Sequence, residues 1–297
     1  MLNVYEQVDR NKKKSVIVIG GFFLFVSAFV WLLGKVFGTS QDVIILAILF
    51  SSASALISYF EGDKIILALS KAEPATKEKY FNFYTAAENL AIAAQIPPPK
   101  LYVIKTQAMN AFATGRDPKH ATVCVTTGLL ERLDKSEIEA VIGHEISHIV
   151  NYDIRLMTIT AILVGMITIL SDWIIRMSFY RDDKEERKIH PILVFIGILG
   201  LIFAPIAAKL IQLALSRRRE YLADASAVKL TRQPQALINA LKKLAYSQPV
   251  ETAHLATAHL YIVNPFRDNQ ETFTKIANLF ATHPPIEARI KNLQQML

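Results

Sequence analysis

Residues 144–148 read HEISH, an instance of the motif HExxH, whose side chains can bind a metal ion and activate water. On a helix, residues four positions apart project from one face, so His144 and His148 can bind the same ion. Glu145 lies beside that face, where it can take a proton from a water molecule on the metal. Zinc suits two neutral imidazoles and one carboxylate. The motif therefore predicts a zinc-dependent hydrolase, and favours a peptidase.

The motif is expected to lie on a helix spanning residues 136–151. Ser136 and Glu139 fit the S-x-x-E capping box that starts many helices. The residues that follow with helical apolar spacing are Ile138, Val141, Ile142, Ile146 and Ile149. Gly143 weakens a helix by about 1 kcal/mol relative to Ala, but leaves room for a substrate or a packed neighbour. The alternative is an ordinary amphipathic helix that carries two histidines by chance.

A third metal ligand is expected downstream, in the segment RRREYLAD at residues 217–224. Glu220 and Asp224 are one helical turn apart and face the same way. Glu220 can bind zinc, and Asp224 can accept a hydrogen bond from the second ring nitrogen of a ligand histidine. The alternative is a solvated charged helix, although an upstream HExxH favours the metal site.

The chain is too apolar for a typical soluble domain, because 52% of its 297 residues are hydrophobic. The excess lies in apolar runs at residues 15–34, 43–60, 156–171 and 191–208. A helix needs about 20 apolar residues to cross the hydrocarbon core, so we expect the first two runs to be transmembrane helices. The other two form a hydrophobic hairpin that either spans the membrane as two helices or is a buried pair of core helices.

Charge predicts the orientation in the membrane. Lys12–Lys14 precede the first run, whereas the loop after it contains only Lys35, which places the N-terminus and, two crossings later, the catalytic segment in the cytoplasm. Residues 176–190 would then lie outside despite an excess of basic residues, a conflict that a re-entrant hairpin would remove. The net charge of +7 fits a membrane protein with basic loops. The sequence lacks the alternation of aromatic and basic residues that is typical of proteins that bind single-stranded nucleic acid.

A small β-sheet is predicted in an otherwise mainly α chain. Val, Ile, Thr and Tyr are enriched at residues 101–106 and 121–127, which we expect to be strands. Residues 71–94 are expected to be helical. Cys124 is the one cysteine, so an intrachain disulfide and a cysteine-rich zinc site are excluded, and we expect it to be a packed strand residue.

These patterns divide the chain into four segments. Residues 1–60 contain the cytoplasmic N-terminus and two transmembrane helices, and residues 61–152 the first part of the catalytic domain. Residues 153–216 form the hydrophobic hairpin, and residues 217–297 the second part of the catalytic domain. Both ligand segments run directly into the hairpin, which predicts a zinc site close to the membrane surface.

Four motifs in this order resemble the HtpX-like family of membrane metalloproteases: NAFATG, HEISH, RRREYLADASAV and HPPIEARI. The resemblance covers essentially the whole chain, and the more distant prenyl-protein proteases share the core. It implies a multi-span, gluzincin-like zinc endopeptidase of the cell membrane, with one zinc ion per subunit. It also implies polypeptide substrates, above all misfolded or damaged membrane proteins.

The resemblance adds further candidate residues. It places His283 and Arg289 beside the active site, where His283 could stabilise an oxyanion and Arg289 could hold Glu220 or the substrate backbone. From the residues alone, Pro284–Pro285 would simply begin a helix with Arg289 on its solvated face. A substrate-binding edge strand is implied at Asn110, Ala111, Phe112 and Ala113. The alternative there is an ordinary loop with a packed Phe112.

Two other classes of function remain open. One is a membrane scaffold that binds zinc without catalysis, against which the presence of Glu145 argues. The other is a transporter or channel that uses histidines for ion passage, although HExxH lies outside the apolar runs. The remaining histidines are expected at the surface or in packing roles: His120, His190, His254 and His259.

Overall fold

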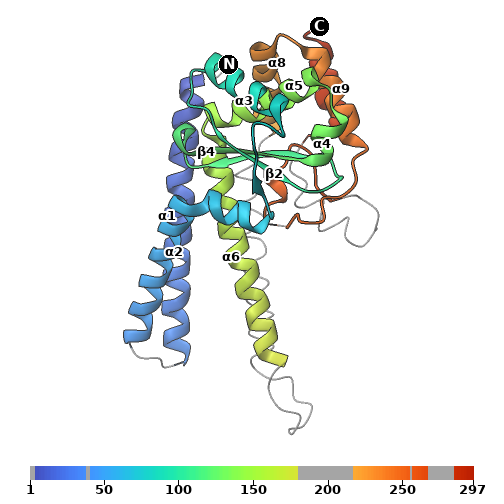
Figure 1. The fold of residues 1–297 in the computed structure, drawn as a ribbon. Coiled ribbons are helices and arrows are strands. Elements are labelled where there is room, and N and C mark those ends of the chain that lie inside the picture. Colours follow the sequence, from blue (N-terminus) through green and yellow to red (C-terminus); the bar gives the residue numbers. More distant parts are fainter. Residues whose placement is uncertain (1–3, 38–40, 180–216, 255, 267–283) are drawn as a thin grey trace.

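The computed structural model describes residues 4–37, 41–179, 217–254, 256–266 and 284–297, which form helices around one small mixed sheet (Figure 1). The prediction of a mainly α chain with a small sheet is confirmed. The fourth apolar run, 191–208, and His190 lie outside the described residues.

The sheet has the strand order β1-β2-β4-β3. The strands are β1 (Glu73–Pro74), β2 (Lys100–Ile104), β3 (Ala111–Gly115) and β4 (Ala121–Thr126). Strands β2 and β4 are parallel, whereas β1 and β3 run antiparallel to their neighbours. The two predicted strands are therefore confirmed to within two residues. Central strand β4 is buried along its whole length, and Cys124 is fully buried in it, as expected.

One predicted helix begins too early. Residues 71–94 were expected to be helical throughout, but helix α3 (Phe81–Ala93) starts only at Phe81. Lys71 has a φ of 52° and so ends the preceding helix, and the Ala75 N–H donates to the Leu101 carbonyl as the chain joins the sheet. The contacts that impose this conformation come from β2 and are not local.

Several helices lie on one side of the sheet and form the main core with it (Figure 1). They are α3, α5 (Lys135–Val150), α8 (Arg217–Thr231) and α9 (Pro234–Ala245). The shorter helices are α4 (Thr127–Arg132), α11 (Ile286–Gln294) and the 3₁₀ turns Pro118–His120 and Ala258–Leu260. Apolar side chains of α5, such as Ile142 and Ile146, are fully buried in this core.

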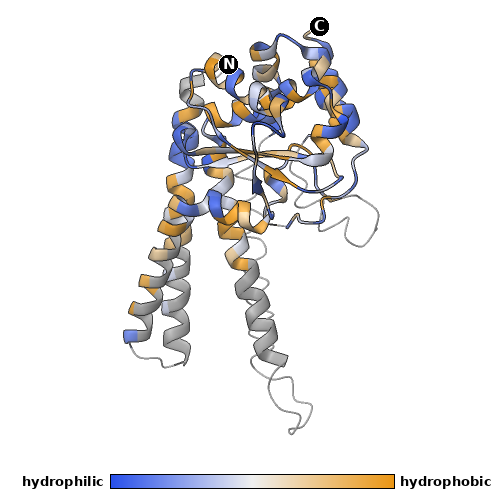
Figure 2. Cartoon of the chain, viewed as in Figure 1, coloured by the Kyte–Doolittle hydropathy of each residue, from blue (hydrophilic) through white to orange (hydrophobic). Residues whose placement is uncertain are grey.

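Three long helices pack against one another: α1 (Val4–Phe37), α2 (Gln41–Leu69) and α6 (Asp153–Phe179). They extend together away from the sheet (Figure 1), and many described residues of α1 and α2 are apolar (Figure 2). Large apolar side chains more than half exposed on α1 and α2 include Val16, Ile17, Leu24, Trp31, Ile45, Leu49, Leu56 and Ile57.

Helices α1 and α2 contain the runs 15–34 and 43–60 that the sequence predicts to be transmembrane. By length and hydropathy, no single helix among the described residues is sufficient to cross a membrane. The pair Lys135–Val150 and Asp153–Ile167 meets that criterion only when taken together, with a bend of 84° between its members.

A candidate metal centre between two helices

Helix α5 carries HExxH and begins slightly earlier than predicted. Its N-cap is Asp134, whose side chain accepts from the Glu137 N–H, while Glu137 accepts from the Asp134 N–H. The capping box predicted at Ser136 and Glu139 is therefore wrong. Both pairs fit the same four-residue pattern, but the Ser136 hydroxyl instead donates to Asp134 at 2.7 Å.

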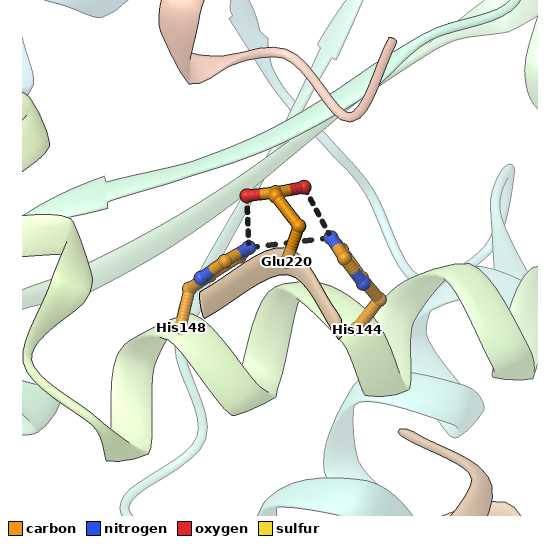
Figure 3. Close-up of side chains that lie close together, drawn as sticks. All are labelled: His144, His148 and Glu220. Carbon is orange, nitrogen blue, oxygen red and sulfur yellow. Dashed lines mark hydrogen bonds and ion pairs between the residues drawn. The ribbon is translucent and has the colours of Figure 1, made fainter. Parts of the chain in front are cut away.

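Three buried side chains meet between α5 and α8: His144, His148 and Glu220 (Figure 3). The two Nε2 atoms are 3.2 Å apart, and the Glu220 carboxylate oxygens lie 3.7 Å from Nε2 of His144 and 3.6 Å from Nε2 of His148. Ligands about 2.1 Å from a tetrahedral ion are roughly 3.4 Å from one another. These three side chains therefore fit one metal ion without rearrangement, and two imidazoles with one carboxylate are a donor set that suits zinc.

Gly143 explains how closely α5 and α8 approach. A Cβ at this position would lie 3.3 Å from the Thr231 methyl group and 3.5 Å from Ala227 on α8. Of the two explanations for this glycine, a packed neighbour is confirmed. The absence of a side chain at Gly143 thus brings Glu220 within reach of the histidines on α5.

Substitution of Gly143 by Val is expected to weaken metal binding. The branched side chain would push α8 away, and overpacking of this kind costs about 1–3 kcal/mol. Zinc affinity, measured by competition with a chromophoric chelator, should fall for Gly143→Val. Gly143→Ala is the matched control, because the Thr231 methyl can yield slightly and Ala favours the helix by about 1 kcal/mol. Equal zinc affinity in the two variants would contradict this packing argument.

Asp224 and Arg289 orient His144 on the side of its ring that faces away from the other ligands. Asp224 Oδ1 lies 2.9 Å from His144 Nδ1, which leaves Nε2 facing the other ligands. The Arg289 guanidinium donates to both oxygens of Asp224, at 2.9 and 2.6 Å. Burial would raise the pKa of Asp224, but Arg289 and His144 lower it to about 2, so the carboxylate is ionised.

Arg289 is fully buried, so the alternative that placed it on a solvated face is wrong. Helix α11 does begin after Pro285, as the alternative expected. Besides Asp224, Arg289 donates to the Ile262 carbonyl at 2.9 Å, and the Ile262 N–H donates to the Ala111 carbonyl at 2.9 Å. Arg289 therefore connects the metal site to strand β3. His283 lies outside the described residues.

Asp153 supports the second histidine, and sequence reasoning missed it. Its Oδ2 lies 3.1 Å from His148 Nδ1, and only 1% of its surface is exposed. Asp153 is the first residue of α6, which follows α5 after a break at Asn151 and Tyr152 and is bent from it by 84°. The prediction that the HExxH helix runs directly into the hairpin is therefore wrong. An aspartate five residues after the second histidine was the available signal.

The two histidines differ in their electrostatic surroundings. Burial lowers the pKa of His144 to about 4, so that imidazole is neutral at pH 7. Burial also opposes protonation of His148, but the hydrogen bond to Asp153 and the charge of Glu220 raise its pKa to about 9. Histidine binds metals when neutral, so a cation that binds at pH 7 displaces a proton from His148.

Glu145 neighbours the metal ligands on α5, and α5 contacts strand β3, one of the two edge strands of the sheet. Burial raises the pKa of Glu145 to about 7, although the positive charges of His148 and Arg289 and the nearby backbone N–H of Ala113 oppose this shift. A pKa near the working pH suits a general base. Residues 111–115 form strand β3, so the alternative of an ordinary loop is wrong, although Phe112 is packed as that alternative expected.

The remaining described histidines lie away from this centre. His120 and His254 are exposed. His259 is buried, and its Nε2 lies 3.0 Å from the Met157 carbonyl. The expectation of surface or packing roles is consistent with these positions.

Comparison with known proteins places this site in a family. The profile of peptidase family M48 matches residues 82–297, which include all three candidate metal ligands. This chain belongs to peptidase family M48. It is 39% identical to "Protease HtpX homolog" of Ligilactobacillus salivarius over 99% of this chain and 100% of that protein. Its identity to the protein of the same name from Dictyoglomus thermophilum is 43%, over 98% of this chain and 94% of that one.

As a member of family M48, the chain is a metallopeptidase, and the predicted resemblance to HtpX proteases is confirmed. Among solved structures, it is similar to "Crystal Structure of S. mikatae Ste24p", with a TM-score of 0.49 and 21% identity. That similarity covers 98% of this chain and 66% of the solved chain.

Proposed function

We propose that this M48 peptidase is a gluzincin-like zinc endopeptidase whose metal ligands are His144, His148 and Glu220. The observation that carries the proposal is the separation of the three ligand atoms, 3.2 to 3.7 Å, at a buried site. Bound zinc would act as a Lewis acid that lowers the pKa of water and polarises a carbonyl. One ion per chain is expected, because the described residues contain one such cluster.

Glu145 is proposed to be the general base. Its carboxylate accepts a proton from the attacking water and delivers it to the amine of the leaving peptide. Asp224 and Arg289 act indirectly, by holding His144 in the tautomer that presents Nε2. His283 remains a candidate oxyanion donor on the strength of the family resemblance.

A substrate peptide is proposed to bind along Asn110–Ala113 by adding a strand to β3. The edge position of β3 and the proximity of Ala113 to Glu145 support this placement, because a peptide bound there would lie near the base. A substrate would have to share or displace the contact that Ile262 makes with Ala111.

Membrane proteins, misfolded or damaged, are the proposed substrates, and the cell membrane is the proposed location. The exposed apolar side chains of α1 and α2 support the membrane location, because the surfaces of soluble proteins rarely carry so many. In this proposal the chain is anchored in the membrane by residues 1–60 and 153–216. The catalytic domain lies on the cytoplasmic side and consists of residues 61–152 and 217–297. Asp153 begins α6 five residues after His148, which supports a zinc site near the bilayer surface.

Zinc content and casein cleavage of the full chain in detergent test the proposed function. We expect one zinc ion per chain, cleavage that stops with 1,10-phenanthroline, and recovery when zinc is added back. His148→Ala should lose both zinc and cleavage, whereas His120→Ala, an exposed histidine, should keep both. Zinc without cleavage would indicate a scaffold, and cleavage insensitive to the chelator would refute the metal mechanism.

A further inference from the structure

We propose that Asn11, near the start of α1, positions the metal ligand His148 through Asp153. This inference rests on the proposed zinc site and adds the N-terminal helix to it. The Asn11 Nδ2 donates to Asp153 Oδ1 at 2.7 Å and to the Asn151 carbonyl at 2.8 Å. The other oxygen of Asp153, Oδ2, lies 3.1 Å from His148 Nδ1.

The Asn11 amide therefore bridges the break between α5 and α6. Asn151 is the C-cap of α5 and Asp153 is the first residue of α6, and the two helices differ in direction by 84°. One side chain from α1 thus binds both sides of the bend that places Asp153 behind His148. Asn151 and Asp153 follow Asn11 by 140 and 142 positions in the sequence, so these contacts are long-range.

Burial makes these hydrogen bonds specific. Asn11 is 2% exposed, Asp153 1% and His148 4%, so water does not compete for them. A buried amide is costly unless its donors and acceptor are all used. Both Nδ2 donor positions of Asn11 are taken, and its Oδ1 accepts from Arg219 at 3.4 Å.

Arg219 extends the same cluster to the third ligand. Its Nε lies 3.4 Å from Asp153 Oδ1, and it is the residue directly before Glu220 on α8. Asn11, Asp153 and Arg219 therefore connect three elements, α1, α6 and α8, behind the metal ligands. A carboxylate that accepts from Nδ1–H fixes the tautomer and ring orientation of a ligand histidine, and the loss of such support lowers metal affinity about 10- to 100-fold.

The test is zinc affinity and the cobalt(II) absorption spectrum of the full chain in detergent, for Asn11→Leu. Leu keeps the volume of the side chain but cannot donate to Asp153. We expect zinc affinity to fall about tenfold and the cobalt spectrum to shift, because His148 is held less firmly. Casein cleavage at saturating zinc should show a lower kcat with little change in KM.

Ser15→Ala is the matched control. Ser15 lies one turn further along α1, is equally buried, and donates only within its own helix, to the Asn11 carbonyl at 2.9 Å. It should keep the affinity and spectrum of the unchanged protein. Should Asn11→Leu fold poorly, Asp153→Asn tests the same chain of contacts. An amide has one acceptor oxygen where the carboxylate has two, so the substituted side chain can accept either from His148 Nδ1–H or from Asn11 Nδ2, and one of the two contacts is lost in either orientation.

Unchanged zinc affinity and an unchanged cobalt spectrum in folded Asn11→Leu, or in Asp153→Asn, would overturn the inference. That result differs from failure of the proposed function. If the unchanged chain binds no zinc, or His148→Ala binds it normally, the proposed metal centre is wrong. If His148→Ala loses zinc but the Asn11 and Asp153 variants behave as the unchanged chain does, the metal centre is correct and only the proposed role of α1 is refuted.

Discussion

Glu145→Gln is expected to abolish peptide hydrolysis while leaving zinc bound. The amide has the size of the carboxylate and fits the same buried place, and Glu145 is not one of the three metal ligands, so we expect the fold and the ligands to be preserved. It cannot accept the proton of the attacking water, and loss of a general base costs roughly 10²- to 10⁴-fold in rate. Casein cleavage and zinc content of the same preparation measure the two effects separately.

Glu139→Gln is the control for this experiment. Glu139 lies on the same helix, outside the metal centre, and its substitution removes the same charge. It should cleave casein at the rate of the unchanged chain. Full activity in Glu145→Gln would refute the role of Glu145, and loss of zinc in that variant would mean that the carboxylate supports the metal rather than the proton transfer.

The local features of this site could be predicted because their causes are local. Helical spacing of isoleucines defined α5 to within one residue, and β-branched runs defined β2 and β4. The ligand pair His144 and His148 follows from the geometry of one helical turn. Glu220 was found because its own turn carries Asp224, although the packing at Gly143 that brings α8 close is visible only in three dimensions.

The features that the sequence did not predict depend on distant contacts. Residues 150–154 contain no Gly or Pro to indicate a sharp bend. The bend depends on Tyr152, which adopts a φ of 58°, within a junction that Asn11 hydrogen-bonds from α1. The family resemblance places Arg289 beside the active site, but its own segment, a charged helix after two prolines, is typical of a solvated face. Its burial depends on distant partners, above all Asp224, 65 residues away.

Arg289→Met is expected to be among the most destabilising substitutions in the described part of the chain. Arg289 is fully buried, and its two hydrogen bonds to Asp224 neutralise a carboxylate that is ionised, with a pKa of about 2. Removal of one partner of a buried ion pair leaves the other charge uncompensated and costs about 3–5 kcal/mol. Glu220, whose carboxylate lies 3.7 Å from the guanidinium, would add its repulsion to that of Asp224.

Resistance of the folded chain to guanidinium in detergent measures this loss, and Arg289→Lys provides a graded comparison. Lys keeps the charge but not the fork that binds both oxygens of Asp224, so an intermediate stability is expected. Wild-type stability of Arg289→Met would show that the pair contributes nothing to folding.

The double variant Arg289→Met with Asp224→Leu separates folding from metal binding. Replacement of both members of a buried ion pair by apolar residues is often neutral for stability, so most of the lost stability should return. His144 would still lack the carboxylate that orients its Nδ1–H, and zinc affinity should therefore remain about 10- to 100-fold low. Recovery of both properties together would mean that Asp224 is needed only to accommodate Arg289, whereas recovery of stability alone assigns the pair to the metal centre.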